Sequence, residues 1–169
     1  SKLIPSIKAV YVVPFTETEI EFQGNEKPWT ELLDYSINTT IFAQLPFDHP
    51  LYILYSSGTT GLPKSIVHGA GGCLLKHLTE HRYHSDINPG DRVFYFTTCG
   101  WMMWNWLVSS LASGATIILY DGAPTFPDAG RMWKLIDEQQ ITHFGTSPKF
   151  LGAVNKAEYS PRKNNQLKD

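Results

Sequence analysis

Cysteine is scarce in this chain, since its 169 residues include only Cys73 and Cys99. The two lie far apart and form no C-x-x-C pair, which gives neither a disulfide framework nor a thiolate metal site. We also expect no secretory leader, because Pro5 comes before any apolar run develops. These features favour a reducing compartment and predict a cytoplasmic protein.

Charge of one sign is not concentrated anywhere, and no long run of apolar residues occurs. The formal net charge is −2, with both signs spread along the chain, whereas nucleic-acid binding requires a basic patch. Residues 93–120 carry no charge, but hydroxyl side chains, Gly100 and Gly114 interrupt them. A membrane-spanning helix needs about 20 continuous apolar residues. We therefore expect neither a nucleic-acid partner nor a membrane span.

What the chain does contain is a globular composition, with 42% hydrophobic residues, in which strand and helix patterns alternate. Short runs of β-branched, aromatic or aliphatic residues predict strands at 7–13, 51–55, 65–68, 93–97, 115–120 and 141–145. Apolar residues at helical spacing predict helices at 72–84, 101–112 and 130–140, with short helices after Pro28 and from Pro148.

This alternation predicts an α/β fold, with a mainly parallel sheet and helices on both faces in three layers. The continuous apolar runs at 51–55 and 115–120 predict buried strands. Gly114 is placed to end the helix at 101–112. We expect one partial domain over 1–169, with a frayed polar tail at 156–169.

The segment with the most chemistry is residues 55–64, which read Tyr-Ser-Ser-Gly-Thr-Thr-Gly-Leu-Pro-Lys between two predicted strands. Glycines let backbone N–H groups approach an anion closely, hydroxyl groups add donors, and a lysine ammonium acts as a point charge. This mixture of groups suits a polyphosphate.

Two other interpretations of this loop are possible. One is an ordinary polar turn, because glycine with Ser and Thr is common in loops. The other is a Walker A loop, since Gly58 and Lys64 have the required spacing. That motif needs glycine where Pro63 stands, and it should open a helix, whereas a strand pattern follows Lys64. The Walker A interpretation therefore fails.

Residues 55–64 resemble the phosphate loop of the adenylate-forming superfamily, which includes acyl-CoA synthetases, luciferases and the adenylation domains of peptide synthetases. The resemblance implies a loop between two strands that binds the β- and γ-phosphates of MgATP. It implies a catalytic role for Lys64, which would offset the growing charge of pyrophosphate. The implied phosphate contacts are Ser56, Ser57, Gly58, Thr59, Thr60, Gly61 and Lys64.

A second block, Thr97-Thr98-Cys99-Gly100-Trp101-Met102-Met103-Trp104-Asn105-Trp106, is similar to the acetoacetyl-CoA synthetases within that superfamily, as are 66–72, 114–116 and 119–122. The resemblance implies that residues after Gly100-Trp101 line the acyl pocket. The expected pocket residues are Trp101, Met102, Met103, Trp104 and Asn105.

These side chains also suit a short acyl chain on physical grounds, because tryptophans make flat walls and methionines adapt to irregular gaps. We hypothesise that Asn105 or an indole N–H donates a hydrogen bond to a 3-oxo group. A site built in this way discriminates against an acid that lacks the oxygen. The alternative is that these aromatic residues belong to a core helix, which is the expected role of Trp106.

His77-Leu78-Thr79-Glu80-His81 matches the H-x-x-E-H zinc pattern. A motif of five residues arises easily by chance, and no third ligand is evident. Because Leu74, Leu75 and Leu78 explain the helix as a packing element, we expect no metal site and partly solvated histidines.

The resemblance implies ATP, Mg²⁺ and CoA as reactants, with most Mg²⁺ ligands outside these residues, and a short carboxylic acid, acetoacetate, as substrate. The family's later motifs and C-terminal domain cannot be found here, so we expect a piece of a ligase whose partner is the rest of its parent chain. The alternatives are a synthetase for acetate, propionate or butyrate, and an isolated, non-catalytic piece that at most binds phosphate.

Overall fold

The computed structural model describes the chain apart from residues 1–3, 16–18, 34–40, 58–60, 166 and 168–169. The chain forms two compact units, Ser1–Gln44 and Leu45–Asp169. In the first unit, β1 (Val10–Val12) and β2 (Glu26–Pro28) pair in parallel, and the 3₁₀ helix η1 (Trp29–Leu32) follows. The predicted strand at 7–13 is therefore shorter than expected, and the helix after Pro28 is a 3₁₀ turn.

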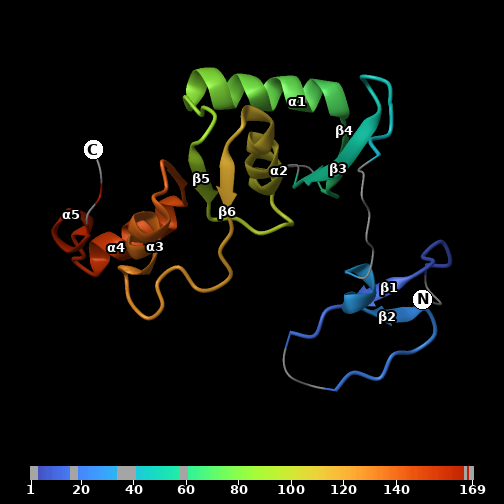
Figure 1. Ribbon diagram of the computed structural model, residues 1–169, viewed down its shortest axis with the longest axis horizontal. Helices are drawn as coiled ribbons and strands as arrows, with labels where there is room; N and C mark the ends of the chain where they lie inside the picture. Colours follow the sequence, from blue (N-terminus) through green and yellow to red (C-terminus); the bar gives the residue numbers. More distant parts are fainter. Residues whose placement is uncertain (1–3, 16–18, 34–40, 58–60, 166, 168–169) are drawn as a thin grey trace. The chain divides into compact units, whose positions relative to one another are not determined.

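The second unit contains a three-stranded parallel sheet (Figure 1). Its strand order is β6 (Thr116–Ile118), β5 (Arg92–Tyr95) and β7 (His143–Gly145). The elements after β5 are α2 (Met102–Ser109) and the 3₁₀ helix η3 (Ser110–Ser113) before β6, α3 (Arg131–Gln139) before β7, and then α4 (Pro148–Lys156) and α5 (Pro161–Asn164).

Helices cover both faces of this sheet. Val93 of β5 packs in a buried cluster with Ile87, Ala115 and Leu107 of α2. The next residue, Phe94, belongs to a second cluster, whose helical members are Met132, Leu135, Phe150 and Val154 of α3 and α4. Successive side chains of a strand point to opposite faces. Thus α2 covers one face and α3 and α4 cover the other, which confirms the predicted three-layer α/β arrangement.

Local signals in the sequence define several helix ends. Gly114 follows η3 with φ 75°, a left-handed conformation that glycine adopts without a steric penalty. At the start of α4, the Ser147 side chain accepts a hydrogen bond from the Phe150 N–H, and Pro148 occupies the first turn. The predicted helix end at Gly114 and the helix start at Pro148 are both confirmed. Beyond α4, Tyr159 packs against the α3–α4 core cluster.

Before the sheet, β3 (Pro50–Ser56) and β4 (Lys64–Gly69) form an antiparallel hairpin. The prediction of a buried strand at 51–55 is wrong, because Leu51 and Ile53 are 55% and 54% exposed and Tyr55 is 71% exposed. An apolar run gives a buried strand only where other layers cover both of its faces. Within the described residues, β3 and β4 pair only with each other.

The hairpin leads into helix α1 (Ala70–Thr79), which continues as the π-helical turn η2 (Glu80–His84). The helix predicted at 72–84 is therefore present but begins earlier. Figure 1 shows α1 lying across the end of the sheet at which β5 and β6 begin. Among the described residues, no helix combines the length and the apolar character needed to cross a membrane.

Candidate functional site

The glycine-rich loop connects the two strands of the hairpin, which is the predicted strand–loop–strand arrangement. Ser56 at the end of β3 lies opposite Lys64 at the start of β4. Residues directly opposite each other in an antiparallel pair present their side chains on one face. The Ser56 hydroxyl and the Lys64 ammonium therefore share a face at the mouth of the loop.

Within the loop, Gly61 has φ +129°, a conformation that a residue with a side chain rarely adopts. Ser57 and Gly61 are exposed, like Ser56 and Lys64. The predicted phosphate contacts Gly58, Thr59 and Thr60 lie outside the described residues.

The Lys64 ammonium makes no ion pair or side-chain hydrogen bond with any residue that the structure describes. A solvated ammonium beside hydroxyl donors can bind a phosphate without first breaking a protein contact. Whether the loop binds phosphate stays a prediction, but the Lys64 charge is available for it.

A cavity of about 570 Å³ lies at the carboxyl ends of β5 and β6. Open α/β sheets bind their ligands at the carboxyl ends of their strands. Aromatic and aliphatic side chains dominate the lining, with a few hydroxyl groups, one carboxylate and one thiol. The lining residues are Phe94, Tyr95, Phe96, Thr97, Thr98, Cys99, Trp104, Leu107, Ile118, Leu119, Tyr120, Asp121 and Gly122.

Among the predicted acyl-pocket residues, Trp104 lines this cavity. Trp101 and Met102 are largely exposed, and Met103 and Asn105 are half-buried; these four are not among the residues that line the cavity. Helix α2 turns successive side chains by about 100°, so only part of a five-residue run can face one cavity. The roles of the four stay predictions.

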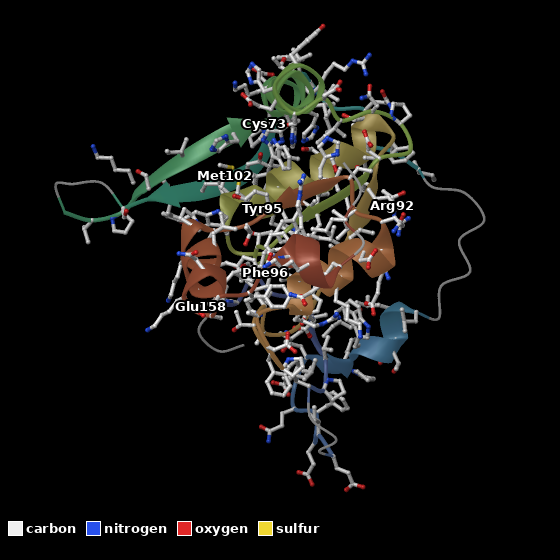
Figure 2. The ribbon with its side chains drawn as sticks, turned by 90° about the vertical axis from the view of Figure 1, so that its left-hand side faces the viewer. Cys73, Arg92, Tyr95, Phe96, Met102 and Glu158 are labelled. Carbon is white, nitrogen blue, oxygen red and sulfur yellow. The ribbon has the colours of Figure 1, made fainter. Side chains whose placement is uncertain are left out.

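Sequence reasoning assigned no site role to the cavity residues at the strand ends, notably Tyr95, Phe96 and Tyr120. Figure 2, which views α1 nearly end-on, shows Tyr95 and Phe96 following each other away from that helix. Their position at the carboxyl ends of the strands predicted at 93–97 and 115–120 was the signal that could have identified them. The Arg131 guanidinium lies 5.1 Å from the centre of the Tyr120 ring, so this wall also carries a cation–π contact.

The histidines of the H-x-x-E-H motif face the interior and not a common metal position. His81 is fully buried, with Nε2 3.1 Å from the Trp106 carbonyl oxygen, and His77 Nδ1 lies 2.8 Å from Ser109 Oγ. Glu80 instead contacts Lys76 and His84 on the outer side. The expectation of partly solvated histidines is wrong for His81, because α1 packs on α2 and η3 along this edge. In the described part of the chain, no group of three His, Cys, Asp or Glu side chains could hold a metal ion.

Burial lowers the pKa of both His77 and His81 below the usual 6.5. Nearby histidines, His68 for His77 and His77 for His81, lower it further, whereas Glu80 and the Trp106 carbonyl oppose the shift. The pKa of Glu80 falls to about 2, mainly through hydrogen bonds from Lys76 and His84, so its charge is constant near neutral pH.

We expect the protein to lose stability as the pH falls below about 6.5. Below this value the unfolded chain binds protons at His77 and His81 that the folded chain does not. The contribution of the two neutral histidines to the free energy of unfolding is therefore complete above pH 6.5 and is lost as the pH falls towards their lowered pKa values. Urea unfolding at pH 7.5 and pH 5.5 measures the difference, and His77→Asn with His81→Gln should reduce it. An equal pH dependence in the double variant would contradict this assignment.

In comparisons with known proteins, nearly the whole chain matches a single protein family. Residues 3–168 match the family model described as "AMP-binding enzyme". The chain is 56% identical over 127 residues to an acetoacetyl-coenzyme A synthetase of Rhizobium meliloti (strain 1021), covering 75% of this chain and 20% of that protein. It is 52% identical over 131 residues to the malonamoyl-CoA synthetase vrtB of Penicillium aethiopicum, covering 72% of this chain and 18% of that protein.

A solved structure shares the fold as well. The acetoacetyl-CoA synthetase from Streptomyces lividans superposes with a TM-score of 0.87 at 44% sequence identity, covering 98% of this chain. The match covers 25% of that structure's chain. The chain thus spans about a fifth to a quarter of the length of the relatives it matches.

Proposed function

The chain belongs to the AMP-binding enzyme family, and on that premise we propose that it supplies the phosphate loop and part of the acid-binding cavity of an ATP-dependent acid–CoA ligase. The proposed acid is acetoacetate. The observation that carries the proposal is the hairpin, in which Ser56 and a solvated Lys64 face the same side at the mouth of a glycine-rich loop.

The proposed reaction has two steps. The carboxylate oxygen of the acid attacks the α-phosphorus of ATP, forming an acyl-adenylate and releasing pyrophosphate. The sulfur of CoA then attacks the acyl carbon, and AMP leaves as the thioester forms. The loop acts in the first step, because its hydroxyl groups, amides and the Lys64 ammonium stabilise the charge that builds on the departing pyrophosphate. This is positioning and electrostatic stabilisation without a covalent enzyme intermediate.

Mg²⁺ would neutralise phosphate charge in such a reaction. The described residues contain no group of three carboxylate, histidine or cysteine side chains that could hold a metal ion, and Mg²⁺ in such sites is usually held by one or two carboxylates together with the phosphates of the substrate. Lys64 and the loop hydroxyls are the groups here that suit the phosphates themselves.

The names of the relatives and the lining of the cavity favour a substrate acid with a carbonyl group at its third carbon. Relatives of this chain are named for acetoacetyl-CoA and malonamoyl-CoA, and both acyl groups carry that carbonyl. Trp104 lines the cavity, and its indole N–H donates to no other described residue, so it is free to donate to such an oxygen. A flat indole and neighbouring tyrosines also suit a chain of only four heavy atoms beyond the carboxylate carbon.

Pyrophosphate release from ATP, measured with the protein that carries this chain, tests the proposal. We expect release to require an acid, with acetoacetate faster than butyrate or acetate and malonamate as a further candidate. Addition of CoA should convert the acid to its thioester. Pyrophosphate release that does not depend on the acid would contradict the ligase proposal. Phosphate binding without turnover would support the alternative of a non-catalytic module.

Trp104→Phe is expected to reduce the preference for acetoacetate over butyrate about 10-fold, because one neutral hydrogen bond is worth roughly 0.5–1.5 kcal/mol. The phenyl ring keeps a flat wall but removes the N–H. The matched variant is Asn105→Ala, which removes the other candidate donor, and its preference should stay near that of wild type because Asn105 is not a lining residue. If the preference is lost in Asn105→Ala and kept in Trp104→Phe, the two roles are reversed.

A further inference from the structure

Two histidines of the α1–η2 helix connect that helix to the end of α2. His77 Nδ1 lies 2.8 Å from Ser109 Oγ, and His81 Nε2 lies 3.1 Å from the Trp106 carbonyl oxygen. That carbonyl is in the last turn of α2, where backbone acceptors lose their helical partners. The Ser110 N–H, which would bond it in a regular helix, donates to the Leu107 carbonyl instead. The histidine thus replaces a missing backbone donor.

The hydrogen atoms of this network can be assigned by counting donors. Ser109 Oγ lies 2.8 Å from the Trp106 carbonyl oxygen and has one hydrogen, which it donates there. Ser109 must then accept the hydrogen bond from His77, so His77 carries its proton on Nδ1. The Trp106 carbonyl can only accept, so His81 carries its proton on Nε2. Its Nδ1 is left to accept from Ser113 Oγ, at 3.5 Å.

Ring contacts continue from His81 to the cavity. The His81 and Trp106 rings meet edge to face with centroids 4.7 Å apart, and Trp106 meets Tyr95 in the same way at 6.2 Å. Tyr95 and Trp104 both line the cavity. Because close-packed rings transmit displacement to their neighbours, a shift at His81 is expected to move this wall.

We propose that His77 and His81 are positioning residues for the acid, which set the rotation and height of α2 and so place Trp104 and Tyr95 in the cavity wall. The inference rests on the proposed function for the identity of the acid. A positioning role explains why His77 and His81, which are polar, occupy the face of the α1–η2 helix that packs on α2, where leucine could also fit. Leucine would bury as well, but it would remove the His81 donor and leave the Trp106 carbonyl with the Ser109 hydroxyl as its remaining side-chain donor among the described residues.

Both imidazoles must be neutral for this arrangement. His81 is fully buried and packs on the Trp106 ring. The titratable groups that influence the pair are His68 on β4 and Glu80 beside them on η2. A second proton on His81 would turn Nδ1 from an acceptor into a donor towards Ser113 Oγ and would place a positive charge on a fully buried ring.

The kinetic test compares His81→Leu, His81→Gln and the control His84→Leu in the protein that carries this chain. Gln can place an amide N–H near the position of Nε2, and His84 is an exposed histidine of the same turn. We expect His81→Leu to raise the KM for the acid about 10-fold with the KM for ATP within twofold, and His81→Gln to recover most of the loss. His84→Leu should behave as wild type. Equal changes in both KM values, or no rescue by Gln, would overturn the positioning role.

Two measurements without substrate keep the inference testable even if His81→Leu does not fold or the acid is misassigned. Nitrogen NMR at pH 7.5 should find the proton of His77 on Nδ1 and that of His81 on Nε2; the opposite tautomers would overturn the assignment. The alkylation rate of Cys99, an exposed thiol that lines the cavity, should change several-fold in His77→Leu, which removes the hydrogen bond to Ser109, and remain constant in His84→Leu. An unchanged rate in His77→Leu would show that the wall does not depend on the contact between His77 and α2.

Pyrophosphate release by the wild-type protein separates the two proposals. If no acid supports release, the proposed function fails, while the tautomers and the Cys99 rate still decide the role of the histidines. If release is normal and these measurements are negative, the inference fails and the proposed function stands.

Discussion

Lys64→Ala is expected to slow acid-dependent pyrophosphate release about 10²-fold in the protein that carries this chain, on the scale of losing one charge-stabilising group. The ammonium is exposed at the mouth of the loop and bonds to no side chain in the described part of the chain, so its removal leaves no buried group unpaired. The expected loss is therefore in catalysis, and thermal stability should stay close to that of wild type.

Lys149→Ala is the matched control, because Lys149 is an exposed lysine on α4 and not a residue of the loop. Lys64→Arg adds a second comparison, since it keeps the charge but changes the donor geometry, and it should recover part of the rate. Single-turnover formation of the acyl-adenylate separates this step from thioester formation. A Lys64→Ala rate within twofold of wild type would remove Lys64 from the mechanism.

Trp104→Ala is expected to reduce kcat/KM for acetoacetate by roughly 10²-fold. Hydrophobic pockets discriminate by about 1–3 kcal/mol for each methylene group, and loss of an indole from the cavity wall lies at the upper end of this range. The enlarged cavity should also accept longer acids, so we expect the activity with hexanoate to rise relative to that with acetoacetate.

The ATP dependence separates a local effect from general damage. Trp104 is only half-buried, and α2 is held to the sheet by the buried Leu107, so Trp104→Ala should fold. The KM for ATP should remain within about twofold of wild type, since the predicted phosphate contacts lie on the hairpin. Trp101→Ala is the matched comparison, as Trp101 is 62% exposed and is not a lining residue. If both variants lose the same activity, Trp104 has no special place in the acid site.

Much of the fold follows from local patterns along the chain. The strand–loop–strand around residues 55–64, the helix that Gly114 ends and the helix that starts at Pro148 were all predicted, and all are present. The physical reason is that backbone conformation at such positions depends on the residue itself: glycine accepts a positive φ, and proline suits a first helical turn.

Tertiary structure decided which of these residues lie in the interior. The apolar run at 51–55 predicted burial, yet its strand pairs only with β4 among the described residues and exposes Ile53 and Tyr55. His81 shows the reverse, because a polar residue of an apparent surface motif is fully buried against α2.

The residues of the candidate site also fall into those that the sequence predicted and those that only the tertiary structure identified. The sequence by itself determined the chemistry of the loop and the presence of a tryptophan-rich helix after β5. Only the packed sheet brought the ends of β5 and β6 together, so that Tyr95, Trp104 and Tyr120 line one cavity while Trp101 lies outside it. A residue's own chemistry sets the conformations and partners it can have, but its neighbours are set by elements that meet from distant parts of the chain.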